Sequence, residues 1–424
     1  MKPPSRRAPA LLVACCAALQ GAGLGCRPAP PPPEPADEAF YEDLQERLLA
    51  AGPGSVVEIP AGRFSLSRTL TLSGRAGVTL RGAGVDRSVL SFAGQRAGAE
   101  GLKVSAADDF TIEGLTIQDT RGDALRIEKS ARVVIRDVKT EWTRGPHQDN
   151  GAYGIYPVQC QDVLIEGAVA IGASDAGLYV GQSTRVVIRR SRAERNVAGI
   201  EIENTSFADV HDNVASGNTG GILVFDLPDL PVQGGRSTRI FDNRVIANNE
   251  PNFAPAGNIV AKVPTGTGIM VMANDEVEIF GNEIRDNGTT SVAIVSYHVT
   301  EEEIRDARYD PYPERIHVHD NLISGGGGDP AGGSSLQSKK LVLALRFALG
   351  TPFPDILWDG IAPPGREPSL CIRDNGAASF ANADAANDFA NVSRGLGAFG
   401  CTLPALEAVV FETGSPGGDA EPAA

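Results

Sequence analysis

The sequence is dominated by a repeat of 22 to 23 residues. A glycine or alanine followed by an apolar residue, any residue and, in most cases, a second apolar residue begins at positions 101, 124, 154, 177, 199, 221 and 268. These starting positions lie 23, 30, 23, 22, 22 and 47 residues apart, which fits one unit length with two insertions. A repeat of this period predicts a stack of similar units that bury one continuous core.

Each unit holds short segments of alternating apolar and polar residues. Strands of about three to five residues cannot bury their apolar faces alone, so they must stack. An asparagine recurs in the later units, at Asn213, Asn243, Asn282 and Asn321, and stacked asparagines hydrogen-bond between coils. A glycine at the start of each unit supplies a tight corner. A leucine-rich repeat has a similar length but needs a leucine skeleton that these units lack.

This pattern resembles the right-handed parallel β-helix repeat proteins of the pectin-lyase-like superfamily. The resemblance covers residues 38–324 and includes an amphipathic stretch at 39–51, which would cap the unpaired edge of the first coil. The predicted fold is therefore all-β: a single-stranded right-handed parallel β-helix of three sheets over 38–324, with an N-terminal helical cap. Residues 325–424 are expected to form a glycine-rich loop and an irregular C-terminal cap, including a short helix at 341–349 and a strand at 355–360.

The first residues are typical of an export signal. Three basic residues within the first seven precede an apolar stretch and small residues that lead to Cys26. This resembles the cleavage site of bacterial lipoproteins and predicts a signal peptide at 1–26 with lipidation at Cys26, then a proline-rich linker at 27–37. The expected location is the bacterial outer membrane, on its periplasmic face or at the cell surface. Plain secretion is the alternative.

The net charge and the cysteines further restrict the class of protein to which the chain can belong. The 424 residues carry a net charge of −15, and no basic stripe points to nucleic acid. No apolar run reaches the roughly 18 residues of a membrane-spanning helix. Cys371 and Cys401 lie 30 residues apart in the irregular C-terminal region and are expected to form a disulfide, whereas Cys160 is expected to be a buried thiol.

The resemblance implies that the glycine-led strand forms the first sheet, whose outer face carries the cleft in the enzymes of the superfamily. Insertions at 144–153, 227–237 and 247–267 flank this sheet and could wall a groove. Tyrosine faces bind sugar rings and carboxylates accept hydroxyl hydrogen bonds or transfer protons, so the outward residues predict a polysaccharide site. The expected substrate-binding residues are Lys103, Arg126, Tyr156 and Tyr179, and the expected catalytic residues are Glu201, Glu203 and Asp226. The alternative is a solvated surface without a ligand.

Sharper enzyme motifs are incomplete. The clustered aspartates of polygalacturonases and the calcium-binding aspartates of pectate lyases are missing. Residues 153–158 (Tyr-Gly-Ile-Tyr-Pro-Val) resemble the Tyr-Gly-Phe-Asp-Pro-His motif of mannuronan C5-epimerases, with its aspartate and histidine replaced by Tyr156 and Val158. His147 and Asp149 in the adjoining loop could substitute for them. Whether the chain is a lyase, a hydrolase, a uronate epimerase or no enzyme stays open.

No metal site is expected among the five histidines, although the pair His317 and His319 could bind a metal ion weakly at the surface. His317 and His319 lie two apart on one strand, which indicates a solvated face, and His211 occupies the same column three coils earlier. No cofactor is expected. The sequence thus predicts an exported, lipid-anchored β-helix that binds a polysaccharide and could modify it, attached to the membrane through its lipid alone. The alternatives are a non-catalytic envelope scaffold that binds a protein partner, and a periplasmic metal-delivery protein.

Overall fold

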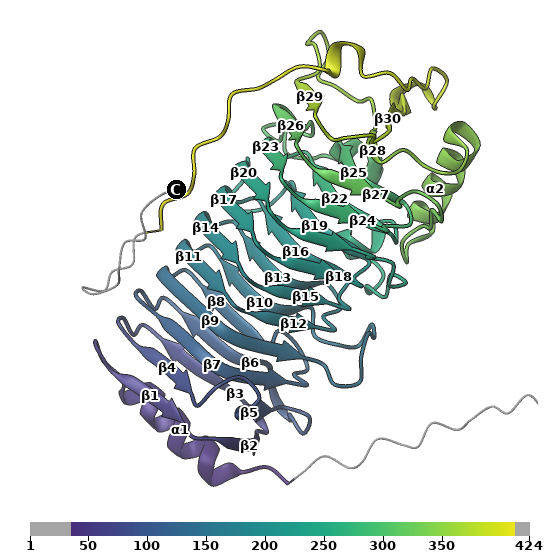
Figure 1. Ribbon diagram of the computed structural model, residues 1–424. Coiled ribbons are helices and arrows are strands. Elements are labelled where there is room, and N and C mark those ends of the chain that lie inside the picture. Colours follow the sequence, from purple (N-terminus) through teal and green to yellow (C-terminus); the bar gives the residue numbers. More distant parts are fainter. Residues whose placement is uncertain (1–34, 412–424) are drawn as a thin grey trace, which may run out of the picture. The chain divides into compact units, whose positions relative to one another are not determined.

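The computed structural model describes residues 35–411, and Figure 1 shows them as a stack of parallel strands. Three ladders of strands run along the stack, and every strand pair within them is parallel. The first sheet contains β3 (Arg68–Ser73), β6 (Ala97–Ser105), β8 (Leu125–Glu128), β10 (Tyr153–Val158), β13 (Ala176–Gly181), β16 (Ala198–Glu203), β19 (Gly220–Phe225), β22 (Thr267–Met272), β25 (Thr290–Val295), β28 (Ile356–Trp358) and β30 (Phe380–Asn382).

The second and third ladders share two long strands, β7 (Thr111–Gln118) and β9 (Ala131–Glu141), which bend from one face to the next. The second sheet also holds β1 (Val56–Ile59), β4 (Thr79–Gly82), β11 (Gln161–Glu166), β14 (Thr184–Arg189), β17 (Ser206–His211), β20 (Arg236–Phe241), β23 (Asp275–Phe280), β26 (Ile316–His319) and β29 (Leu370–Arg373). The third holds β2 (Gly62–Ser65), β5 (Ser88–Ser91), β12 (Val169–Ile171), β15 (Arg192–Glu194), β18 (Val214–Ser216), β21 (Arg244–Ile246), β24 (Glu283–Arg285) and β27 (Leu322–Ser324). The predicted three-sheet parallel β-helix is confirmed.

The core is a column of apolar side chains along the axis of the stack. Parallel register places equivalent residues of successive coils directly above one another, so each inward position repeats a branched apolar side chain. In the first sheet, the column of fully buried residues consists of Leu102, Leu125, Ile155, Leu178, Ile200, Ile222, Ile269, Val292 and Ile356.

The glycines that begin the repeat units serve close stacking. A Cβ atom on Gly199 would lie 2.5 Å from the carbonyl oxygen of Gly221, and one on Gly221 would lie 2.6 Å from that of Gly268. Neither glycine has a left-handed backbone. The tight-corner role expected from the sequence is therefore wrong at these positions, because it is the neighbouring coil, not the turn, that leaves no room for a side chain.

Two asparagine ladders run through the corners of the stack. In the ladder predicted from the sequence, the Nδ2 group of Asn213 donates to Oδ1 of Asn243 at 3.0 Å, and the pattern continues through Asn282 and Asn321 to Asn375. A second ladder, which the sequence analysis did not predict, contains Asn196, Asn218, Asn248 and Asn287. Both hold the corners of successive coils together.

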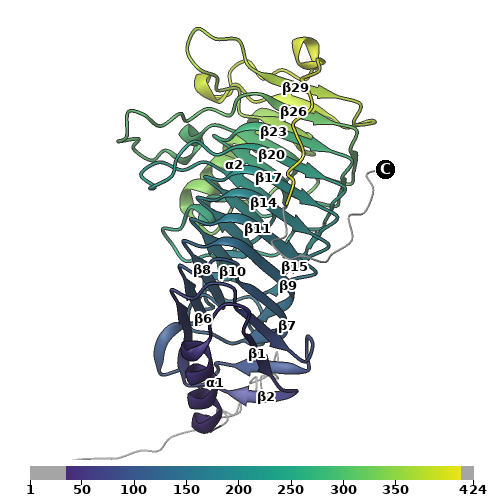
Figure 2. The same cartoon turned by 90° about the vertical axis from the view of Figure 1, so that its left-hand side faces the viewer.

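The helix α1 (Glu38–Ala50) closes the N-terminal end of the stack, as expected (Figures 1 and 2). The side chain of Asp37 caps the helix by accepting a hydrogen bond from the amide of Phe40. Tyr41, Leu44 and Leu48 are buried against the first coil. This packing covers the apolar end of the core column.

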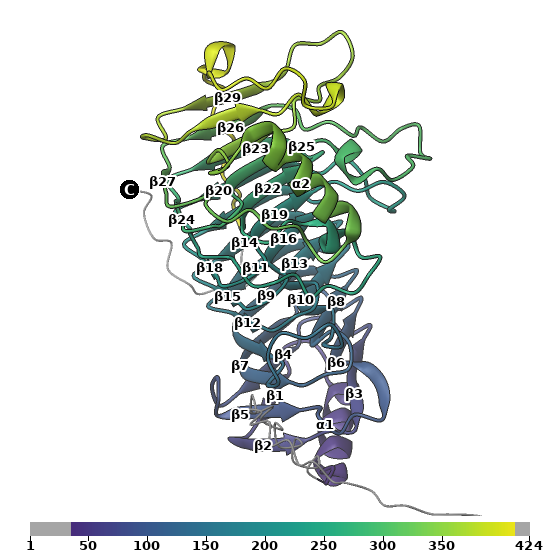
Figure 3. The same cartoon turned by 90° about the vertical axis from the view of Figure 1, so that its right-hand side faces the viewer.

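The stack continues beyond residue 324, where the sequence analysis ended it. An insertion of about 30 residues, which holds α2 (Leu336–Leu349), hides the repeat spacing, but β28 then pairs with β25 and β29 pairs with β26. Figure 3 shows α2 lying along the first sheet. Short 3-10 turns occur at η1 (Ile259–Lys262), η2 (Tyr297–Thr300), η3 (Ala385–Asn387) and η4 (Gly397–Phe399).

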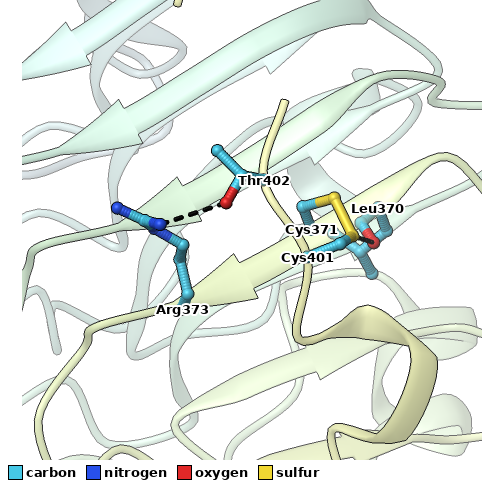
Figure 4. The surroundings of a disulfide bond; sticks show 5 residues. All are labelled: Leu370, Cys371, Arg373, Cys401 and Thr402. Atoms are coloured by element: carbon cyan, nitrogen blue, oxygen red, sulfur yellow. Dashed lines mark hydrogen bonds between the residues drawn. A yellow bond between two sulfur atoms is a disulfide. The ribbon is translucent and has the colours of Figure 1, made fainter. Parts of the chain in front are cut away.

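Cys371 on β29 forms a disulfide with Cys401, shown in Figure 4. Residues 402–411, here named the C-terminal strap, then run back along the second sheet (Figure 2). The strap amides of Leu406 and Val409 donate to the carboxylates of Glu278 on β23 and Asp209 on β17, at 3.0 and 3.1 Å. The disulfide thus fixes the upper end of a segment that spans several coils.

Cys160 is buried and carries a free thiol. Within the described residues, no helix is long and apolar enough to cross a bilayer. The predicted signal peptide, Cys26 and most of the proline-rich linker lie outside the residues that the structure describes.

Candidate functional site

The register of the first sheet aligns the outward residues singled out from the sequence. Lys103 neighbours Arg126, Arg126 neighbours Tyr156, and Tyr179 neighbours Glu201 in successive coils. Strands in a sheet lie about 4.8 Å apart, so each of these side chains can contact the next. These residues therefore form one column on the outer face.

The C-terminal half of this outer face is covered. Leu223, Phe225 and Met270 are buried in a second apolar cluster, beneath residues from 254–263, η2 and the following loop. Outward apolar residues of this size need a cover, because water would otherwise meet a long apolar patch. The expectation of an open groove along the whole sheet, walled by the loop at 247–267, is thus wrong: this insertion lies over the sheet itself.

Three tyrosines gather where the cover ends. The ring centroids of Tyr153 and Tyr156 lie 4.4 Å apart, those of Tyr153 and Tyr179 4.6 Å, and those of Tyr156 and Tyr179 4.9 Å. Tyr179 is 3% exposed, whereas Tyr153 and Tyr156 are partly exposed. The cluster offers an aromatic surface to solvent at one end and is buried at the other.

Three carboxyl groups lie behind the tyrosines. Glu201 and Glu203 project from β16, and Asp175 precedes β13; all three are buried. The Tyr179 hydroxyl donates to Glu203 Oε1 at 2.6 Å, and Asn258 Nδ2 donates to Asp175 Oδ2 at 2.9 Å. Glu201 is 1% exposed, and its Oε2 atom has no hydrogen-bond partner in the described part of the chain. Buried carboxyl oxygens are seldom left unpaired in a folded protein.

Burial shifts the acidity of this cluster. It raises the pKa of Asp175 to about 7, with a further contribution from the Glu203 carboxylate and against the hydrogen bonds from Asn258 and Tyr153. Burial, then Asp175 and Glu203, raise the pKa of Glu201 well above its ordinary value. Burial also raises the pKa of Glu203, against the Tyr179 hydrogen bond. Each of the three carboxyl groups therefore holds its proton more tightly than a free carboxyl group does.

The exposed end of the cluster carries charges that neutralise one another. Arg126 lies 3.1 Å from Glu128 and 3.7 Å from Asp123, and its guanidinium lies 5.0 Å from the centroid of the Tyr156 ring. Lys103 lies 3.4 Å from Glu128. Burial raises the pKa of Asp123 to about 6, which the nearby Arg126 opposes. The two basic residues predicted to bind substrate are thus present but already paired with acids.

Asp226, one of the expected catalytic residues, also holds a loop. Its Oδ1 atom accepts hydrogen bonds from the amides of Gly234 and Gly235 at 3.0 and 2.9 Å, which holds the loop at 227–237. Tyr309 donates to its backbone carbonyl at 2.6 Å. These bonds give Asp226 a role in positioning the loop, and its catalytic role stays a prediction.

The side chain of His147 contacts its loop neighbour Asp149: the amide of Asp149 donates to Nδ1 of His147 at 3.1 Å. Both side chains are largely exposed. Neither contacts the three tyrosines or the three carboxyl groups through a hydrogen bond in the described residues. The structure therefore gives no support for their replacing the missing epimerase residues.

Sequence reasoning missed Asp123, Asp175 and Asn258 and met Tyr153 only as part of a motif. A signal for the aspartates exists, because Asp123 directly precedes the repeat unit that begins at Ala124, and Asp175 lies two residues before the one that begins at Gly177. No such signal marks Asn258, which arrives from the insertion at 247–267 and reaches a carboxyl 83 residues away along the chain.

Comparisons with known proteins concern the fold. A family described as right handed beta helix region matches residues 76–235. The A-module of mannuronan C-5 epimerase AlgE4 from Azotobacter vinelandii is similar with a TM-score of 0.54 and 17% identity, over 80% of this chain and 91% of the module. The AlgE6 A-module of the same organism has a TM-score of 0.47 and 15% identity, over 81% and 91%. No curated protein sequence matches the chain.

Proposed function

We propose that this chain, a right-handed parallel β-helix protein of the pectin-lyase-like superfamily, binds a polysaccharide and transfers protons to or from it. The proposed site, here named the tyrosine–carboxyl cluster, consists of Tyr153, Tyr156, Tyr179, Asp175, Glu201 and Glu203. The observation that carries the proposal is the buried Oε2 atom of Glu201, which lies beside Asp175 and Glu203 and has no hydrogen-bond partner among residues 35–411. A carboxyl kept dry and unpaired destabilises the fold, and such groups are concentrated at functional sites.

The exposed and the buried residues of the site would have different roles. The partly exposed rings of Tyr153 and Tyr156 would hold a sugar ring by stacking, with Arg126 beside them for hydroxyl or carboxylate groups. Asp175, Glu201 and Glu203 would supply a protonated acid and an ionised base next to each other. The Tyr179 hydroxyl, which bonds to Glu203, links the two parts.

The charge of the site narrows the substrate class. Lys103 and Arg126 are balanced by Glu128 and Asp123, and the chain as a whole carries −15. A strongly polyanionic chain would meet no net positive surface here. We therefore propose a neutral or sparsely charged glycan, although the module named above is that of a mannuronan epimerase.

The test measures binding and chemistry separately. Tyr156→Ala should abolish retention of a glycan that the wild-type protein retains on a glycan array, whereas Tyr312→Ala in an outer loop should leave retention unchanged. Glu201→Gln should keep binding and stop the formation of reducing ends, unsaturated products or epimerised residues. A wild-type protein that retains no glycan contradicts the proposal. If the wild-type protein retains a glycan but forms no product, the cluster is a binding site and not a catalytic one.

We also propose that the chain is exported and anchored by a lipid on Cys26, as its sequence suggests. The test compares membrane fractions of cells that produce the wild-type protein or Cys26→Ser. The wild type should sediment with membranes and leave them only with detergent, whereas the variant should be found in the soluble fraction. Equal membrane association of both would contradict lipid anchoring through this residue.

The exposed face of α2 favours a second candidate, a scaffold that binds an envelope protein. Phe347 is 85% exposed, and Leu336 and Leu343 lie on the same face of the helix and are also exposed. Apolar stripes of this kind often mark protein contacts. If the variants Leu343→Ser and Phe347→Ser no longer bind a purified partner that the wild type binds, and still retain the glycan, this role for α2 is supported.

A further inference from the structure

A second buried polar column lies on the outer face of the second sheet, remote in the fold from the tyrosine–carboxyl cluster. The register places Asp209, Arg239, Glu278 and His317 one above another in successive coils. The C-terminal strap covers this column through its bonds to Asp209 and Glu278. The face that the sequence analysis expected to be solvated around His317 is therefore buried.

Three side chains on β23 and β26 converge at this face of the second sheet. Glu278, His317 and His319 each offer one ligand atom, and these atoms all lie within 4.8 Å of one another. His317 is 4% exposed, and neither of its ring nitrogens has a hydrogen-bond partner in the described part of the chain. A histidine that serves only the packing of a core would normally have at least one nitrogen bonded, because an unpaired buried polar atom is destabilising.

The other two ligands are already oriented. Nδ1 of His319 lies 2.7 Å from Oδ2 of Asp320, which leaves Nε2 directed at Glu278 Oε1, 3.2 Å away. The second carboxylate oxygen of Glu278 accepts the amide of Leu406 in the strap at 3.0 Å. Histidine ligands of metals commonly make such a bond to a carboxylate through the nitrogen that does not bind the metal.

We propose that Glu278, His317 and His319 form a binding site for a divalent transition-metal ion such as Zn²⁺. Two imidazoles and one carboxylate are a ligand set that zinc accepts, with water in the fourth position. Tetrahedral ligands about 2.0–2.1 Å from the ion lie about 3.3 Å from one another, so modest side-chain rotations close the present cluster onto an ion. His317 then gains the partner that it lacks.

The same sheet provides a matched comparison. His211 lies three coils earlier in the column of His319, and its Nδ1 atom also lies 2.7 Å from a following aspartate, Asp212. Its ring stacks on Phe241 as that of His319 stacks on Phe280. The position equivalent to His317 is Asp209, which is paired with Arg239 at 2.9 Å. His211 thus has the surroundings of His319 without the second histidine.

The experiment uses the full chain without a histidine tag, freed of metal by a chelator. Titration with Zn²⁺ followed by calorimetry, and with Co²⁺ followed by its visible absorption, should show one ion per chain. His317→Ala and Glu278→Gln should weaken Zn²⁺ binding by more than about 100-fold, since they remove ligands. Asp320→Ala should weaken it by about 10- to 100-fold. His211→Ala should leave it unchanged.

Circular dichroism checks that each variant is folded. If His317→Ala does not fold, Asp320→Ala decides the matter, because Asp320 is more than half exposed and its removal should leave the fold intact. The proposal is overturned if the wild-type chain binds no ion at a one-to-one ratio. It is also overturned if His211→Ala weakens binding as much as Asp320→Ala does.

Discussion

Two sets of buried polar side chains repeat along this stack, and they differ in how fully they are hydrogen-bonded. In the ladder of Asn218, Asn248 and Asn287, each amide both donates to and accepts from its neighbours. In the cluster of Asp175, Glu201 and Glu203, neighbouring coils place acids together and leave one oxygen unpaired.

The difference shows what a repeat can and cannot stabilise. A neutral amide carries both donors and acceptors, so identical residues stacked coil upon coil satisfy one another. Ionised carboxylates carry acceptors only, so stacking them creates repulsion that protons must relieve. The ladder therefore holds the fold together, whereas the acidic cluster is tolerated at a loss of stability.

The largest expected effect is that of breaking a ladder. Asn248→Ala should lower the free energy of unfolding by about 3–5 kcal/mol, because it leaves the buried amide of Asn218 and the carbonyl of Ala215 without partners. The adjacent Asn249 is exposed, and Asn249→Ala should have an effect of about 1 kcal/mol or less. Denaturant unfolding measures both. Equal losses would show that the ladder is no more important than a surface amide.

The acidic cluster should make the protein less stable as pH rises. The pKa of Asp175 is about 7 when folded, against an ordinary 3.8, so the folded state binds the proton more tightly. Its contribution is fully present below about pH 4 and is lost as pH rises through 7, on the order of 4 kcal/mol. The pKa values of Glu201 and Glu203 are also raised, so these two groups add to the loss of stability as pH rises.

Other buried carboxyls, such as Asp275, titrate in the same range, so a variant isolates the cluster. Glu201→Gln should unfold at nearly the wild-type temperature at pH 5 and at a higher temperature at pH 8. Glu58→Gln, at an exposed position of the second sheet, should follow the wild type at both values. Calorimetry measures all three proteins. A parallel decline for Glu201→Gln and the wild type would mean that Glu201 carries no unfavourable charge.

The smallest expected effect concerns the hydroxyl that joins the two parts of the site. Tyr179→Phe removes the donor to Glu203 and should lower the free energy of unfolding by about 1 kcal/mol at neutral pH. Tyr156→Phe, at the partly exposed end, should change it by less than about 0.5 kcal/mol. If both changes are equally mild, the Tyr179–Glu203 hydrogen bond does not stabilise the cluster.

The repeat made the fold predictable, and the interruptions of the repeat limited the rest. Regular spacing gave the outward column of Arg126, Tyr156 and Tyr179 and the ladder of Asn213. It could not show that the insertion at 247–267 folds over the sheet, because that segment has no period and its partners lie far away in sequence. The apolar outward residues Leu223 and Met270 did signal a cover, since a solvated face would not repeat large apolar side chains.

The same limit explains the second sheet. The spacing of His317 and His319 indicated an exposed strand face, and nothing in the chain beyond Cys401 announced that it would return to cover that face. Asp175 was missed for a similar reason, because it lies just outside the alternating strand pattern and interacts with Glu201 of the next coil only in the folded stack.

The strap also bears on the order in which the protein folds. Its amide at Val409 bonds to a carboxylate 200 residues earlier, whereas ladder contacts span 22 to 54 residues. Closing so long a loop is entropically costly and cannot succeed before the coils between its ends are stacked. The strap is thus suited to dock last, and resistance of the segment beyond Cys401 to proteases would report that the whole stack beneath it is complete.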